Sequence, residues 1–178
     1  NLTNGPFQTV AKSLSKYNIN YTLYDQTGCE PTYHSLMKAV TFARGATSKP
    51  FDAILAVGGG SVMDTAKAVN LFISHPNTDI FDYVNAPIGK GTPIPDKSTL
   101  QKLICVPTTA GTGSECTGTA IFDFENIKTN GKSVDVKTGI SNRNLKPSLG
   151  IVDPENILTV TPGIAAATGL DVLCHAIE

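Results

Sequence analysis

The chain has 178 residues, of which 40% are hydrophobic and 16% are charged, and its formal net charge is −1. This length is sufficient for one full domain with its own core, and the composition is that of an ordinary globular α/β protein. The sequence contains neither a basic patch suited to nucleic acid nor an apolar run long enough to cross a bilayer. We therefore expect no nucleic-acid partner and no membrane partner.

The first third of the chain alternates between helical and strand-like patterns. Apolar residues recur at helical spacing from Phe7 to Tyr17, and the segment from Ile19 to Tyr24 alternates and is rich in β-formers. These patterns predict a helix followed by a strand. A second helix is predicted from Leu36 to about Gly45, and a short apolar strand over 52–57.

Three glycines and a serine, 58–61, follow this strand and lead into a helical pattern that runs to Ser74. We expect Ser61 to cap that helix. Glycines allow a tight turn and a close approach of phosphate to the backbone, and the first helical amides point outward unpaired. The motif is neither GxGxxG nor GxxxxGK[ST]. Its position between strand and helix favours a phosphate site over the alternative, a plain structural turn.

A second glycine-containing loop follows a later strand. The pattern predicts a short helix over 79–84, a surface loop over 87–96 and a strand over 103–106, which leads into PTTAGTGSE at 107–115. If the strands are parallel, this loop lies at the same sheet edge as the glycines, where ligands bind in such folds. The alternative is a hydroxyl-rich turn that caps a helix, with Thr112 and Glu115 at capping-box spacing. The two interpretations are compatible.

The last part of the chain changes its pattern. Segments 117–124 and 134–140 look like an antiparallel pair, 149–152 like a last apolar strand, and 157–178 like a mostly helical segment with Pro162 in its first turn. Strands that alternate with helices predict an α/β fold, a mostly parallel sheet with helices on both faces. The final helical segment could begin a second domain.

Two pairs of ionisable residues lie at helical spacing. Asp171 and His175 are four residues apart, so they share one helix face and could ligate the same divalent metal; a hydrogen-bonded surface pair is the alternative. Two ligands are too few for a metal site, so further ligands must come from elsewhere. Asp64 and Lys67 are three residues apart and could be a simple helix ion pair. His34 and His75 are expected to face solvent.

The four cysteines form no CxxC pair, and Cys105 lies in an apolar segment, which predicts a buried free thiol and favours a reducing compartment. The chain begins at Asn1, and its last residues have the pattern of a helix in mid-course. We therefore expect a fragment of a longer polypeptide.

Together these motifs resemble the iron-containing (group III) alcohol dehydrogenase family. The resemblance rests on GGGSVMDTAK at 58–67, PTTAGTGSE at 107–115, IVDP at 151–154 and ATGLDVLCHAIE at 167–178. These segments stand in the family's order, and the resemblance covers essentially the whole chain. Within the family, 82–91 and 117–123 are most similar to a mitochondrial branch that exchanges hydride between a hydroxy acid and an oxo acid.

The resemblance implies a Rossmann-like dinucleotide-binding domain over 1–156, lacking its first strand, and the beginning of an all-helical metal domain over 157–178. It further implies an NAD cofactor and a divalent metal, Fe²⁺ or Zn²⁺. Asp171 and His175 match two metal ligands, and the family's other two ligands would be histidines downstream. The residues implied to contact NAD are Gly59, Gly60, Ser61, Asp64, Thr108, Thr109, Thr112 and Lys137.

The implied chemistry is hydride transfer from 4-hydroxybutyrate through bound NAD to 2-oxoglutarate, with a mitochondrial location and a possible homodimer. Two alternatives stay open. One is an ordinary NAD-dependent alcohol dehydrogenase of the same family, which releases its cofactor each turnover. The other is a catalytically inactive, truncated nucleotide-binding module.

Overall fold

The structure is a computed structural model that describes residues 5–47, 49–129 and 131–178. It is a mixed α/β structure, as the sequence pattern predicts. In order they are α1 (Pro6–Lys16), α2 (Tyr33–Ala46), β1 (Ala53–Gly58), α3 (Gly60–Ser74), α4 (Ile80–Tyr83), β2 (Lys102–Pro107), β3 (Thr119–Thr129), β4 (Lys132–Ser141), β5 (Leu149–Gly150) and α5 (Pro162–Ile177). Short 3₁₀ turns lie at Lys97–Thr99, Ser114–Cys116, Arg143–Leu145 and Pro154–Thr159.

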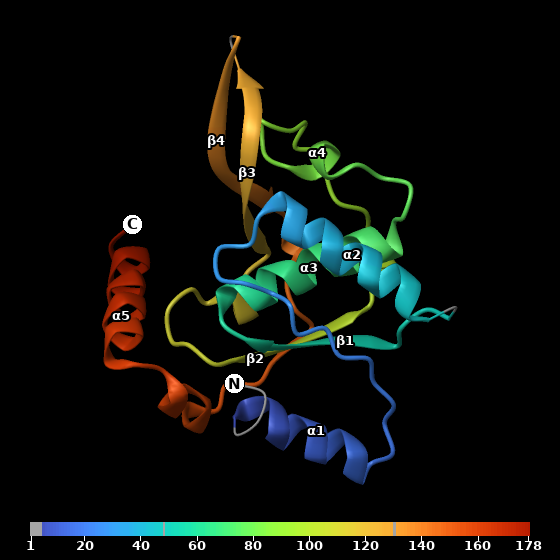
Figure 1. The fold of residues 1–178 in the computed structure, drawn as a ribbon, viewed down its shortest axis with the longest axis vertical. Coiled ribbons are helices and arrows are strands. Elements are labelled where there is room, and N and C mark those ends of the chain that lie inside the picture. Colours follow the sequence, from blue (N-terminus) through green and yellow to red (C-terminus); the bar gives the residue numbers. More distant parts are fainter. Residues whose placement is uncertain (1–4, 48, 130) are drawn as a thin grey trace.

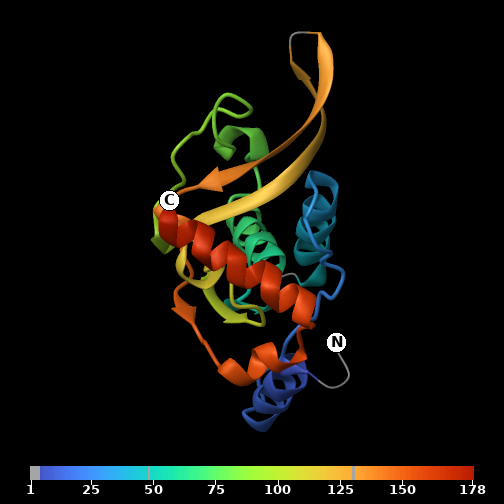
Figure 2. The ribbon, with the colours of Figure 1, turned by 90° about the vertical axis from the view of Figure 1, so that its left-hand side faces the viewer.

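A parallel sheet of order β1-β2-β5 forms the centre of the fold. Helices α2 and α3 lie on one side of it and α1 lies on the other (Figures 1 and 2). This arrangement confirms the predicted parallel sheet with helices on both faces. The last strand is shorter than expected, because only Leu149 and Gly150 pair with β2.

The predicted antiparallel pair is a long hairpin of β3 and β4 that projects from the rest of the molecule (Figure 1). Its proximal half belongs to the main core, since Phe122, Phe124 and Ile140 are each almost fully buried. They pack with α2, α3 and α4, and each such side chain contributes about 1.5–3 kcal/mol of hydrophobic stabilisation. The core therefore fixes the hairpin base beside α3.

The strand predicted over 19–24 is wrong, because this segment has no regular secondary structure. Ile19, Tyr21 and Leu23 are about half exposed, at 53%, 49% and 41%. The rings of Tyr21 and Tyr24 instead contact Phe7 and Phe42. β-formers indicate a strand only where a neighbouring strand accepts the backbone hydrogen bonds, and here none pairs with the segment.

The predicted cap of α3 is also wrong. Gly59, in an extended conformation, is the N-cap, and Ser61 is the second residue of the helix. The amides of Val62 and Met63 both donate to the Gly59 carbonyl, which starts the helix before the serine. The Ser61 hydroxyl is therefore available elsewhere, and its Oγ accepts a hydrogen bond from the Glu30 amide at 3.3 Å.

Among the described residues, none of the helices is both long and apolar enough to cross a bilayer.

Candidate cofactor and metal site

The glycine turn (residues 58–61) and the threonine loop (residues 107–115) begin at the same level of the sheet. Gly58 pairs with Pro107 in the β1–β2 register, and the Thr108 amide donates to the Gly58 carbonyl at 3.0 Å. Parallel strands end at one edge, so both connections lie at the carboxyl edge of the sheet. The structure confirms the expected proximity of these two loops.

The threonine loop packs directly onto the glycine turn. A Cβ atom on Gly60 would lie 2.7 Å from Cγ2 and 2.9 Å from Oγ1 of Thr112. A Cβ atom on Gly59 would lie 3.3 Å from Oγ1 of Thr109. The absence of side chains at 59 and 60 therefore permits the close approach of the two loops.

The capping box predicted from Thr112 to Glu115 is not the observed geometry. Gly113 is the N-cap of the Ser114–Cys116 turn, at a left-handed φ of +62° that favours glycine. Thr112 contributes in another way, since its Oγ1 accepts a hydrogen bond from the Ser114 amide at 3.2 Å. The Thr112 hydroxyl therefore bonds the amide of Ser114, one residue earlier than the amide of Glu115 that a capping box would use.

A cleft of about 750 Å³ opens between these loops, the base of the hairpin and α5. This volume is within the range of roughly 300–1,000 Å³ that is typical of small-molecule sites. Seven predicted site residues line it: Gly60, Ser61, Asp64, Thr112, Lys137, Asp171 and His175. Gly59, Thr108 and Thr109 are not among the lining residues, and they lie where the two loops contact each other.

Helix α5 closes one side of the cleft. Gly111 of the threonine loop lies against it, because a Cβ atom there would be 2.9 Å from Thr168 Cβ and 3.3 Å from Asp171 Oδ2. Nε2 of His175 lies 3.9 Å from Oδ1 of Asp171, and both side chains are substantially exposed, at 54% and 39%. The predicted common helix face is therefore present and is turned toward the cleft.

Metal ligands are incomplete in the described ranges, where no three His, Cys, Asp or Glu side chains come close enough together to hold an ion. His34 is exposed, and His75 Nε2 lies 2.9 Å from Thr99 Oγ1, so neither lies with Asp171 and His175. A carboxylate and an imidazole suit Fe²⁺ or Zn²⁺ equally well. The chain thus offers two donors of the right chemistry.

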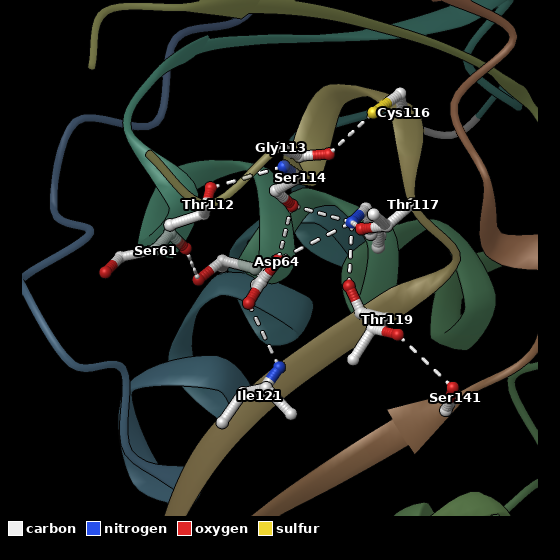
Figure 3. Close-up of polar contacts among 12 residues, drawn as sticks. Ser61, Asp64, Thr112, Gly113, Ser114, Cys116, Thr117, Thr119, Ile121 and Ser141 are labelled. Atoms are coloured by element: carbon white, nitrogen blue, oxygen red, sulfur yellow. Dashed lines mark hydrogen bonds and ion pairs between the residues drawn. The ribbon is translucent and has the colours of Figure 1, made fainter. Parts of the chain in front are cut away.

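The floor of the cleft contains a buried polar network that joins three elements (Figure 3). Ser114 Oγ donates to Asp64 Oδ1 at 2.6 Å, and the Ile121 amide donates to Asp64 Oδ2 at 3.0 Å. Lys67 Nζ donates to Ser114 Oγ at 2.6 Å and to the Thr119 carbonyl at 2.7 Å. The network therefore connects α3, the threonine loop and β3.

Lys67 is fully buried, and its Nζ lies 3.6 Å from Asp64 Oδ1. Burial lowers the pKa of Lys67 by disfavouring the charged form, and the nearby Asp64 carboxylate partly offsets this. The sequence spacing indicated only a helix ion pair and missed the contacts with Ser114 and Thr119. The alanines on either side of Lys67, and Met63 one turn before it, indicate a buried position, but they do not identify its partners.

Glu30 is a cleft residue that sequence reasoning missed. Its carboxylate lies 3.4 Å from Lys137 Nζ, with both side chains exposed, and its amide donates to Ser61. The segment is fixed to the hairpin because the Asp123 amide donates to the Pro31 carbonyl at 3.0 Å. No local motif marks Glu30, because it reaches the site only through a pairing of segments far apart in sequence.

Cys105 confirms the prediction of a buried free thiol on β2. Burial raises the pKa of the Cys105 thiol to about 11, although the nearby Lys67 ammonium acts in the opposite direction. Cys29, Cys116 and Cys174 are free and exposed.

The parallel sheet, with the glycine turn and the threonine loop at its carboxyl edge, defines a Rossmann-like α/β fold. The sequence profile described as iron-containing alcohol dehydrogenase matches residues 1–154, and the chain belongs to this family. The chain is 53% identical over 173 residues to the mitochondrial hydroxyacid-oxoacid transhydrogenase of Bos taurus. The aligned region covers 97% of this chain and 34% of that relative. The chain spans about a third of the length of the curated relatives it matches.

Solved structures agree with this assignment. An iron-containing alcohol dehydrogenase from Thermococcus thioreducens superimposes with a TM-score of 0.80 at 29% identity, covering 97% of this chain and 42% of that one. A sulfoacetaldehyde reductase from Bifidobacterium kashiwanohense, solved in complex with NAD⁺, gives a TM-score of 0.74 at 28% identity and covers 98% of this chain and 43% of that one.

Proposed function

We propose that residues 1–156 form the dinucleotide-binding domain of an NAD-linked, metal-dependent oxidoreductase and that 157–178 begin its helical metal domain. One observation carries the proposal. The glycine turn, the threonine loop, Lys137 and the Asp171–His175 pair all meet at a single cleft, although they come from distant parts of the chain. The NAD⁺ complex of the similar reductase supports the same cofactor here.

In this proposal the pyrophosphate of NAD lies against Gly59, Gly60 and Ser61. No side chain caps α3, so we assign the phosphate-binding role to the amides of Gly60 and Ser61, which precede the amides that bond to the Gly59 carbonyl. Asp64 lies nearby, and Thr108, Thr109 and Thr112 hold the threonine loop against the cofactor. The exposed ammonium of Lys137 is proposed to contact the ribose hydroxyls. In the structure it lies beside the Glu30 carboxylate.

Asp171 and His175 are proposed as two ligands of a divalent metal, Fe²⁺ or Zn²⁺. When bound, such an ion polarises the substrate oxygen and stabilises developing alkoxide charge. The chain's own residues orient the nucleotide from the opposite side of the cleft. The exposure of the Asp171 and His175 side chains leaves their donor atoms accessible.

The proposed reaction is hydride exchange between two acids. The hydroxyl-bearing carbon of 4-hydroxybutyrate gives a hydride to NAD⁺ and its hydroxyl loses a proton, which leaves succinic semialdehyde. The keto carbon of 2-oxoglutarate would then take up that hydride from the bound cofactor, and its oxygen a proton, which would give 2-hydroxyglutarate. The identity of 53% to a hydroxyacid-oxoacid transhydrogenase supports this pair, and the relative's mitochondrial name supports a mitochondrial location.

An ordinary NAD-dependent alcohol dehydrogenase is the second candidate, favoured by the name of the similar Thermococcus thioreducens enzyme. The test uses the complete polypeptide that carries this chain, loaded with Fe²⁺ or Zn²⁺. It is incubated with 4-hydroxybutyrate alone and then with 2-oxoglutarate added, and free NADH and both products are measured.

Succinic semialdehyde that accumulates only with the oxo acid, without free NADH, is the expected result. Steady NADH release with the alcohol alone identifies the ordinary dehydrogenase. No turnover in either assay, with NAD and metal both bound, overturns the proposed substrates. An inactive nucleotide-binding module is identified by NAD binding without metal binding or turnover.

A further inference from the structure

Lys67 has no part in the proposed chemistry, yet it is the most completely buried charged side chain near the cleft. Lys67 does not itself line the cleft, but its ammonium donates hydrogen bonds to Ser114, Thr117 and Thr119, which do. A buried ammonium is costly unless it is paired and hydrogen-bonded. Its partners therefore show what the charge stabilises.

The partners of Lys67 on other elements lie on one segment that borders the cleft. Ser114 is near the end of the threonine loop, the Thr119 carbonyl begins β3, and Thr117 Oγ1, at 3.4 Å from Lys67 Nζ, lies between them. Asp64 adds a second connection from α3 to Ser114 and to the Ile121 amide. One helix turn thus holds the whole segment 114–121 through side chains.

This segment determines where Thr112 lies. The Ser114 amide donates to Thr112 Oγ1, and the Thr112 side chain packs against Gly60. A shift of Ser114 by a fraction of an ångström would therefore move Thr112 off the glycine turn. The chain of contacts runs from Lys67 through Ser114 to Thr112, and Lys67 itself does not line the cleft.

We propose that Lys67 is a positioning residue for the nucleotide: its buried ammonium fixes Ser114 and the start of β3, and thereby holds the threonine loop in the geometry that binds NAD. The nucleotide part of this inference rests on the proposed function. The positioning part is a property of the ligand-free protein and is testable without NAD.

Asn70 provides a matched control on the same helix. It is also buried, at 3% exposure, and lies almost one turn after Lys67. Its Nδ2 donates to the Gln101 carbonyl and its Oδ1 accepts from the Gln101 amide, both at 2.9 Å. Asn70→Leu therefore removes buried polar contacts of α3 that hold a segment outside the cleft.

The experiment compares wild type, Lys67→Met, Lys67→Gln and Asn70→Leu in the complete polypeptide. Hydrogen–deuterium exchange is measured over 108–121 without nucleotide, and the Kd for NAD is measured by calorimetry well below the unfolding midpoint. Lys67→Gln, which keeps an N–H donor, serves where Lys67→Met does not fold. We expect faster exchange over 108–121 and a Kd for NAD about tenfold higher in the Lys67 variants, and neither change in Asn70→Leu.

Equal effects of Asn70→Leu and Lys67→Met would overturn the proposal, because general destabilisation would then explain both. Unchanged exchange over 108–121 in the Lys67 variants would also overturn it, as would faster exchange with an unchanged Kd. Faster exchange in a protein whose wild type binds no NAD refutes the proposed cofactor but leaves the positioning role supported.

Discussion

The two sides of the cleft differ in how much of their order comes from contacts within this chain. On the α3 side, Asp64, Lys67 and Ser114 are buried or nearly so and are joined by short hydrogen bonds. On the α5 side, Asp171 and His175 are exposed and 3.9 Å apart, and the apolar residues Leu170, Leu173 and Ile177 are more than half exposed. The α3 side is therefore preorganised, whereas the α5 side is held by few contacts within the described part of this chain.

This comparison makes substitutions on the two sides separable. A change on the α5 side should remove metal and turnover with little loss of stability, because few contacts are broken. A change on the α3 side should lower stability and nucleotide affinity together, because the same hydrogen bonds serve both.

The largest effect is expected from His175→Ala in the complete polypeptide. If His175 is the proposed metal ligand, its loss lowers the affinity for the ion that would polarise the substrate oxygen, and turnover should fall by more than about hundredfold. Bound metal is measured by mass spectrometry beside activity, and the unfolding midpoint should stay within error. His34→Ala is the control, since that histidine is exposed away from the cleft. Full metal content and activity in His175→Ala would show that His175 on α5 is not a metal ligand.

Asp64→Ala tests the opposite side. It leaves the Lys67 ammonium buried without its carboxylate, and the free energy of unfolding should fall by about 3 kcal/mol. Urea unfolding without nucleotide measures this. Lys90→Ala is the control, because it breaks an exposed pair with Asp82 that should leave the midpoint nearly unchanged. Similar midpoints for the two variants would show that the buried network is not the source of order.

Cys105 gives a pH dependence to the stability of the sheet beneath the α3 side. Its pKa rises from the usual value of 9.0 to about 11 in the folded protein. As pH rises, the thiol therefore loses its proton in the unfolded state before it does so in the folded state. The free energy of unfolding should fall by about 2 kcal/mol between pH 9 and pH 11. Urea unfolding of wild type and Cys105→Ala from pH 8 to 11, with reductant, measures the difference. Parallel curves would contradict the shift, and Cys29→Ala should behave like wild type.

Gly60→Ala is expected to have the smallest effect on folding but a specific one on binding. The added methyl meets Thr112 at 2.7 Å, so the threonine loop must move, and the Kd for NAD should rise about tenfold. Thr112→Ser in the same protein removes the nearest methyl and should recover part of the loss. Gly45→Ala, where nothing lies within 4 Å, should leave the Kd unchanged. An unchanged Kd in Gly60→Ala would show that the loop has room to adjust.

Local patterns predicted the parts of the fold whose signals are local. The helix ending near Gly45, the strands before both loops and the common face of Asp171 and His175 follow from periodicity and spacing, and the structure has them. The segment from Ile19 to Tyr24 failed for the opposite reason. Its residue types favour a strand, but strand formation depends on a partner that the local sequence does not specify.

The site shows the same division. The glycine turn and the threonine loop were found from their motifs, and the parallel register explains why they meet. The contacts of Lys67 with Ser114 and of Glu30 with Lys137 join residues 47 and 107 positions apart. Such partners are chosen by tertiary packing, so no spacing rule reveals them, and the interpretation of Lys67 as half of a simple ion pair was incomplete.

The alignment of Gly58 with Pro107 in adjacent parallel strands limits how the sequence can change in length. One residue inserted in β1 or β2 would displace one loop from the other by about 3.3 Å and turn every following side chain to the opposite face. The exposed residues 96–99, between the two strands, lie outside this register. Length variation among relatives should therefore collect between the two strands, and the number of residues within each strand should stay constant.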